Sequence, residues 1–283
     1  MAKKFDTKTE GLDAYVYMAK TFADTPWLHY GMWEYGERIV VPNVRRAQER
    51  YVDKLLSLLP PAPARIFDIG GGTGEMAAVL IERGYDVEML TPSAVQIAAA
   101  RERLGADAIL HHKRFEDYDG SGKFDILLFS ESFQYVPLAD SLPRFRDLLS
   151  DQGVVVIADC FRSEGYKGGL APGGGHPFGA FSAAVSANGF EVVTDWDVTE
   201  AVAPSMIIDQ NFYRGFLAPL IDQISSGLKA SRPIVHWFAS AGYKLFTSAD
   251  ARYRMRERLK ADYRSPEKFR EVNTYRFLLL KPD

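Results

Sequence analysis

The sequence predicts a doubly wound α/β fold with a mostly parallel, seven-stranded sheet. Two observations support this: short apolar segments alternate with helical segments from residue 65 onward, and the first strand leads directly into a glycine-rich turn at 70–74. Such alternation places helices on both faces of a parallel sheet and joins the strands by right-handed crossovers. Ligands of these sheets bind beyond the carboxyl ends of the strands, so we expect the functional residues there.

Residues 1–63 are predicted to form an N-terminal helical segment. Apolar residues recur at helical spacing within 15–22 and again within 47–58, and an aromatic run at 27–33 without that periodicity lies between them. Prolines within 60–63 then end the second helix and mark the start of the next unit.

The α/β core is expected at 64–204 and 272–283, with a mobile glycine-rich loop at 165–179. Asn188 and Gly189 are predicted to end a helix with a left-handed cap. The expected strands are 65–69, 86–90, 107–111, 124–130, 153–159, 190–198 and 274–281. The expected helices between them are 75–83, 93–104, 139–149 and 178–187.

The segment before the last strand, 205–271, is helical in pattern and rich in aromatic residues. We expect it to form a helical cap on the substrate side of the sheet. Its aromatic side chains fit a helical core and equally fit the lining of a pocket, so the sequence suggests an apolar or aromatic ligand only weakly.

Composition narrows the class of protein. The 34 basic and 37 acidic residues are interspersed and give a formal net charge of −3, so no positive field is available to attract a nucleic acid. The single cysteine, Cys160, excludes an internal disulfide and a cysteine-rich metal site, and no metal is expected. No apolar run is long enough for a membrane span, and the first ten residues are charged, so we expect a cytoplasmic protein.

The glycine turn indicates a bound ligand. Gly70, Gly72 and Gly74 permit a tight turn, close approach of the backbone to a ligand, and a helix that starts beside the strand. Dinucleotide-binding enzymes use a related turn, but Asp68 and Glu75 are poorly placed beside a pyrophosphate. Asp68 is better suited to lie near an ammonium group.

Further motifs within 28–160 make the chain resemble the class I S-adenosylmethionine-dependent methyltransferases, which have a Rossmann-like core. It is similar to the branch of cyclopropane fatty acid and mycolic acid synthases and to related small-molecule methyltransferases. The motifs are His29-Tyr30-Gly31-Met32-Trp33 with Ala47-Gln48, the glycine turn, Thr91-Pro92-Ser93-Ala94-Val95-Gln96, and Phe115-Glu116.

The resemblance implies S-adenosyl-L-methionine as cofactor, with the segment 1–63 covering its site. It places Tyr30 near the donor's carboxylate, Thr91 and Gln96 at the ribose and methionine, and Phe115 and Glu116 at the adenine. For Phe115 a role in the core is equally open, and Ser93 is better explained as a helix N-cap. The full set of implied cofactor-binding residues is Tyr30, Asp68, Gly70, Gly72, Gly74, Thr91, Gln96, Phe115, Glu116 and Ser130.

The resemblance breaks after the fourth strand. The cyclopropane-forming enzymes carry Phe-Glu-His there, whereas this chain has Phe133, Gln134 and Tyr135. The missing acid and histidine argue against cyclopropanation and favour ordinary methyl transfer to oxygen, nitrogen or carbon. The candidates for a catalytic base are His176, Glu131, Tyr30 and His29. His176 would act from a loop that closes over the substrate, although a solvated loop histidine and a satisfied loop carboxylate at Glu131 remain as alternatives.

The expected function is methyl transfer to a small-molecule acceptor, such as an apolar or aromatic metabolite of specialised metabolism. A lipid, fatty-acyl or isoprenoid acceptor and a non-catalytic binding protein with this fold remain as alternatives. The sequence leaves the oligomeric state open, including a homo-oligomer.

Overall fold

The computed structural model describes residues 21, 23–168, 171–260 and 263–283. The helix expected around residues 15–22 lies almost entirely outside this part of the chain.

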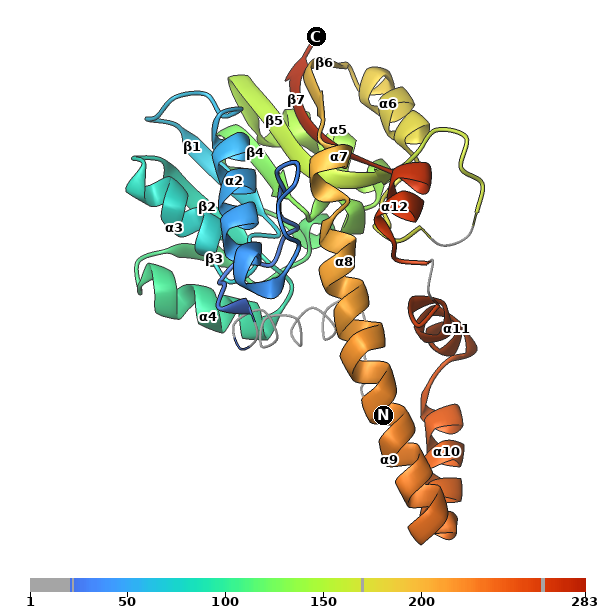
Figure 1. The fold of residues 1–283 in the computed structure, drawn as a ribbon. Helices are drawn as coiled ribbons and strands as arrows, with labels where there is room; N and C mark the ends of the chain where they lie inside the picture. Colours follow the sequence, from blue (N-terminus) through green and yellow to red (C-terminus); the bar gives the residue numbers. More distant parts are fainter. Residues whose placement is uncertain (1–20, 22, 169–170, 261–262) are drawn as a thin grey trace.

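Seven strands form one sheet in the order β3-β2-β1-β4-β5-β7-β6 (Figure 1). All neighbours pair in parallel except β7, which is antiparallel to both β5 and β6. The predicted doubly wound, mostly parallel seven-stranded sheet is therefore confirmed. The strands are β1 (Arg65–Ile69), β2 (Asp86–Leu90), β3 (Ile109–His111), β4 (Phe124–Ser130), β5 (Leu149–Arg162), β6 (Phe190–Asp197) and β7 (Asn273–Pro282).

Helices cover both faces of the sheet because each buries an apolar stripe. On one face, α2 (Val44–Leu56) buries Tyr51 and Leu55, and α3 (Glu75–Glu82) packs into the same cluster. On the other face, α5 (Leu138–Leu148) and α6 (Phe178–Ala187) bury phenylalanines. The short 3-10 helices η1 (Val41–Asn43), η2 (Phe115–Asp117) and η3 (Phe133–Tyr135) and the α-helices α4 (Ala94–Leu104) and α7 (Thr199–Val202) complete the core.

The segment expected as a cap is helical, but it extends away from the sheet (Figure 1). α8 (Ser205–Gln210), the π-helical η4 (Asn211–Leu217) and α9 (Ala218–Ser231) run on as one long helix. α10 (Pro233–Phe246) returns alongside α9, and α11 (Ala249–Arg258) and α12 (Pro266–Val272) lead back to β7. We call residues 211–260 the helical arm. α9 and α10 pack on each other, and the arm points away from the sheet, whereas the sequence had suggested a cap over it.

A buried ion pair joins the two segments that flank the arm, α8 and the stretch before α12. Arg264 Nε lies 2.6 Å from Asp209 Oδ2, and both side chains are almost fully buried. Arg264 Nη2 also donates to Tyr30 Oη at 3.1 Å, which links the base of the arm to the N-terminal loop. Within the part of the chain described, no helix is both long enough and apolar enough to cross a bilayer.

Ser93 caps α4, as the sequence suggested. Its Oγ accepts a hydrogen bond from Gln96 N at 3.2 Å. Ser93→Ala removes this acceptor, so we expect a loss of about 1 kcal/mol in the free energy of unfolding, measured by urea denaturation. Ser186→Ala, at an exposed position inside α6, is the control and should change stability little. An equal loss in both variants would contradict a capping role.

Candidate active site

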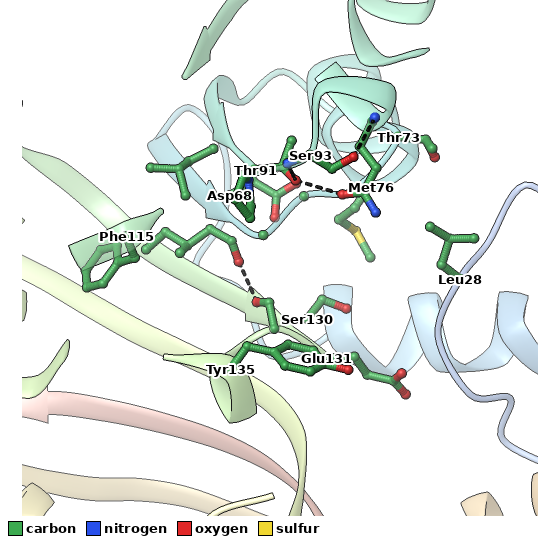
Figure 2. Close-up of a pocket in the computed structure, with 18 of the residues that line it drawn as sticks. Leu28, Asp68, Thr73, Met76, Thr91, Ser93, Phe115, Ser130, Glu131 and Tyr135 are labelled. Carbon is green, nitrogen blue, oxygen red and sulfur yellow. Dashed lines mark hydrogen bonds between the residues drawn. The ribbon is translucent and has the colours of Figure 1, made fainter. Parts of the chain in front are cut away.

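A cavity of about 410 Å³ lies at the carboxyl ends of β1, β2 and β4 (Figure 2). In Figure 2, Asp68, Thr91 and Ser93 lie on one side of it, and Ser130 and Glu131 lie on the other. The predicted residues that line it are His29, Asp68, Gly70, Gly72, Thr91, Gln96, Phe115, Glu116, Ser130 and Glu131. Tyr30, Gly74 and His176 are not among the lining residues.

The glycine turn leaves open space where the cavity meets the backbone. Gly72 has φ of +60°, and a Cβ there would contact only Leu28 Cδ1, at 3.6 Å. Gly74 has a different role: a Cβ there would lie 3.1 Å from Ala100 Cβ, so this glycine allows α3 to pack closely on α4. Gly72 is therefore the glycine that lets a ligand approach the turn.

Asp68 lies in the cavity wall as a buried carboxyl with one unpaired oxygen. Its Oδ2 is buried and accepts no hydrogen bond from the described residues. Burial raises the pKa of this carboxyl from 3.8 to about 7. A buried acceptor without a partner is costly, so this oxygen suits a ligand that brings a cation or a hydrogen-bond donor.

The expected repulsion between Glu75 and an anionic ligand is weaker than the sequence suggested. Glu75 begins α3 and lines the cavity, but its Oε2 lies 2.6 Å from Arg103 Nη1. This ion pair offsets the negative charge, so Glu75 alone does not exclude a pyrophosphate.

Thr91 and Gln96 lie together in the cavity wall, as their shared motif suggested. Thr91 Oγ1 donates to the side-chain oxygen of Gln96 at 2.7 Å. Because this bond uses the amide oxygen, the amide nitrogen of Gln96 is the group that remains to donate to a ligand. Glu116, in η2 after β3, lines the same cavity.

Phe115 combines the two roles that the sequence left open. The residue lines the cavity, but its ring packs edge-on against Phe129, with a centroid distance of 5.7 Å, and against Phe145. The ring is thus part of the core beneath the cavity wall.

Glu131 is a strained, buried carboxyl at the end of β4. Its φ of +53° lies in the left-handed region, which costs a non-glycine residue about 1–3 kcal/mol and is often found at functional sites. Its Oε1 accepts hydrogen bonds from Tyr30 N and Tyr275 Oη, both at 2.8 Å. Burial is the main reason that the pKa of this carboxyl rises to about 8, and Asp159 raises it further.

Two tyrosines extend this network beneath the cavity. Tyr275 Oη lies 3.1 Å from Tyr51 Oη, which in turn lies 3.1 Å from Ser130 Oγ. The network joins Glu131 to a second lining residue, Ser130. Sequence reasoning missed Tyr275 because it lies on the last strand and shares no local pattern with the site.

His29 faces the cavity as a neutral acceptor. Its Nδ1 bonds to the carbonyl of Tyr30 at 2.8 Å, so Nδ1 carries the proton and Nε2 has a free lone pair. Nε2 is buried and has no hydrogen-bond partner among the described residues, and burial lowers the pKa of the ring to about 4. His29 is therefore a hydrogen-bond acceptor at neutral pH and a weak base.

Tyr30 and His176 lie outside the cavity. Tyr30 Oη accepts from Arg264, and burial holds the pKa of its phenol well above 10. His176 Nε2 bonds to the carbonyl of Val136 at 2.9 Å, and burial lowers its pKa. The sequence predicted a mobile loop around His176, but its described part is fixed by hydrogen bonds between the Asn273 side chain and the backbone of Gly173 and Gly174. His176 thus holds the backbone around η3 in place. Tyr30 contacts the site by the hydrogen bond from its backbone N–H to Glu131.

Several lining residues come from segments next to the predicted motifs. Ser132 Oγ donates to the carbonyl of Ile69, which ties β4 to the glycine turn. Further lining residues lie within the motifs or a few residues from them, and that proximity was the only signal for them; they include Leu28, Thr73, Met76, Arg114, Tyr135 and Val136. Among the residues described, no three His, Cys, Asp or Glu side chains are grouped closely enough to hold a metal ion.

Comparison with known proteins agrees with this geometry. The methyltransferase domain family matches residues 44–267. An uncharacterised methyltransferase of Staphylococcus carnosus is 32% identical over 121 residues, which cover 41% of this chain and 58% of that protein. A malonyl-acyl-carrier-protein O-methyltransferase of Geobacter sulfurreducens is 32% identical over 125 residues, covering 39% of this chain and 45% of that protein. The match thus spans about half the length of these curated relatives.

Solved structures share the fold at low sequence identity. The cyclase SpnF is 18% identical with a TM-score of 0.66, covering 100% of this chain and 97% of its own. The geranyl diphosphate C-methyltransferase of Streptomyces coelicolor, solved with S-adenosyl-L-homocysteine, is 16% identical with a TM-score of 0.64, covering 97% and 99%. These findings confirm the resemblance to class I S-adenosylmethionine-dependent methyltransferases, and the chain belongs to the methyltransferase domain family.

Proposed function

We propose that this protein transfers a methyl group from S-adenosyl-L-methionine to a small-molecule acceptor. The observation that carries the proposal is the cavity beside Gly72, whose wall contains the buried carboxyl of Asp68 with one unpaired oxygen. The fold alone does not decide the chemistry, since a cyclase shares it. The site therefore has to support the activity.

The residues of the cavity fit this donor. Gly72 gives the ligand access to the backbone of the turn, and the oxygen of Asp68 suits the donor's ammonium group. Thr91 and Gln96 offer polar groups for the ribose and methionine, and Glu116 offers an acceptor for the adenine amino group. When bound, S-adenosylmethionine supplies an already activated methyl group, so the protein has mainly to align the acceptor.

Glu131 is the residue that we propose as general base. Its pKa of about 8 is close to neutral pH, the range in which proton transfer is efficient. A base is needed when the acceptor is a phenol, another hydroxyl or an ammonium group. Because Glu131 offers such a base, we favour an O- or N-acceptor. His29, as a neutral acceptor in the same cavity, would orient the acceptor's proton.

An isoprenoid acceptor is the second candidate. It is supported by the similarity to geranyl diphosphate methyltransferase, whose structure holds Mg²⁺ and geranyl diphosphate. The two acceptor classes are separated by supplying methyl-labelled donor with phenols, amines and geranyl diphosphate in parallel, the last with and without Mg²⁺. Label only in the prenyl product would overturn the O- or N-acceptor proposal.

Donor binding is tested by calorimetric titration with S-adenosylhomocysteine and, separately, with NAD. We expect binding of the first and none of the second. Binding of NAD alone would overturn the proposed cofactor and the methyl transfer that depends on it.

Binding of the donor product is expected to release a proton from Asp68. At pH 6 this carboxyl is mainly protonated in the free protein, because its pKa is about 7. An ammonium group beside it favours the carboxylate, so binding should release up to about one proton per ligand, and the release should fade above pH 8. Titration at pH 6 in buffers with different ionisation enthalpies measures this proton. Asp68→Asn should remove it, and an unchanged release in that variant would exclude Asp68.

A further inference from the structure

The helical arm exposes large apolar side chains to solvent in the part of the chain that the structure describes. Trp237 is 64% exposed, Phe238 65% and Ile234 71%, and all three lie near the tip at the start of α10. Others follow along the arm: Phe216, Leu220, Ile221, Ile224, Val235, Tyr243, Phe246 and Tyr253. Large exposed apolar side chains gathered on a helical pair usually mark an interaction site.

The arm also carries a net positive charge, whereas the rest of the chain is net acidic. Residues 211–260 contain nine Lys or Arg and three Asp or Glu, a formal charge of +6. Since the whole chain has a net charge of −3, the remaining residues together carry −9. Lys229 and Arg232 lie at the tip itself, directly before the exposed aromatic residues of α10.

The two helices of the arm are fixed to each other. Ser225 Oγ of α9 and His236 Nε2 of α10 lie 3.0 Å apart, within hydrogen-bond distance. The basic and aromatic side chains of the tip are therefore presented on one paired-helix unit.

We propose that the tip of the helical arm binds an anionic lipid surface. Helices that lie in a membrane interface combine Trp, Phe and aliphatic side chains with Lys and Arg, because the rings enter the headgroup region while the cations pair with lipid phosphates. The tip has this combination at Lys229, Arg232, Ile234, Trp237 and Phe238.

Charge separation along the molecule favours a lipid surface over a second copy of the arm. Two arms would each bring +6, so arm-to-arm pairing is opposed by charge. The 14 residues of α9 correspond to about 21 Å of helix, which exceeds two Debye lengths at physiological ionic strength. Repulsion between an anionic surface and the net acidic remainder of the protein is therefore screened when the tip touches that surface.

The test measures binding of the full-length protein to vesicles of phosphatidylcholine alone and with about 30% phosphatidylglycerol, by cosedimentation at low and high salt. We expect binding to the anionic vesicles only, and loss of binding in high salt. Equal binding to both kinds of vesicle, or binding to neither, overturns the proposal. The vesicles contain no methyl donor, so the result is independent of methyl transfer.

Two arm variants and two matched controls locate the binding surface. The first variant is Trp237→Ser with Phe238→Ser, and the second is Lys229→Glu with Arg232→Glu. Each should weaken vesicle binding at least about tenfold, because every ring removed and every charge reversed takes away a favourable interaction with the lipid. The controls are Tyr35→Ser, at a fully exposed tyrosine of the N-terminal loop, and Arg83→Glu with Lys281→Glu, which changes the net charge equally.

The controls should bind as the unchanged protein does. Arm variants that retain full affinity would overturn the proposal. A concentration-dependent dimer that Trp237→Ser with Phe238→Ser abolishes, seen by analytical ultracentrifugation without lipid binding, would assign the surface to a second copy instead.

Discussion

Gly72→Arg is expected to abolish binding of S-adenosylhomocysteine while the protein stays folded. A Cβ at Gly72 meets only Leu28 Cδ1, at 3.6 Å, so the new side chain has room but extends into the cavity. A cation there occupies the space of the ligand and opposes its ammonium group. We expect a loss of affinity of at least about 100-fold in calorimetric titration, or roughly 2.7 kcal/mol.

Gly36→Arg is the matched control for backbone strain. Gly36 has φ of +76°, is exposed and would place a Cβ in open space. Both variants force an L-residue into the left-handed region, which costs about 1–2 kcal/mol, so their stabilities should fall alike. Only Gly72→Arg should lose the ligand. Normal binding by Gly72→Arg would show that the glycine turn is not the donor site.

The order of strands and helices could be predicted because it depends on local pattern. β1, β2 and β4 are formed within the expected residues, since each is a short apolar run bounded by turn residues. β5 is longer than expected, from Leu149 to Arg162, because it continues to pair with β7 as far as Arg162. Periodicity does not report where a strand loses its partner.

The direction of the helical arm could not be predicted, because its helices are apolar on more than one side. Trp237 and Phe238 are adjacent in sequence and so lie on different parts of the helix surface, yet both are exposed. The pattern correctly predicted helices, but it does not determine which surface they cover.

The site was predictable where its residues follow strand ends and was hidden where it depends on long-range contacts. Asp68, Thr91 and Ser130 meet because parallel strands end at one edge. The bond from Tyr275 to Glu131 joins residues 144 positions apart, and the bond from Arg264 to Tyr30 joins residues 234 apart. No local signal in the sequence reports such contacts.

Glu131→Gln is expected to lower turnover on the acceptor about 100- to 1000-fold while S-adenosylhomocysteine still binds. Glutamine keeps a side-chain oxygen that accepts from Tyr30 N and Tyr275 Oη, so the network and the fold are retained. What is lost is the carboxylate, whose contribution as a general base is typically in this range. The measurement is kcat with labelled donor on the acceptor found in the panel described above.

The pH profile separates a base from a structural carboxyl. With a pKa of about 8, only about a tenth of Glu131 is ionised at pH 7 and half at about pH 8, so turnover should rise with pH through about 8 and level off near about pH 9. Glu131→Gln should lack this rise. An unchanged kcat and the same profile would leave Glu131 with a structural role alone.

Asp159→Asn is the matched control, because Asp159 is also a buried acid, with a pKa raised to about 7, and does not line the cavity. It should retain turnover, and its profile should move to lower pH. The sign follows from charge: Asp159 raises the pKa of Glu131, so removing its negative charge makes Glu131 easier to ionise. A shift to higher pH, or a loss of turnover as large as in Glu131→Gln, would contradict this assignment of the base.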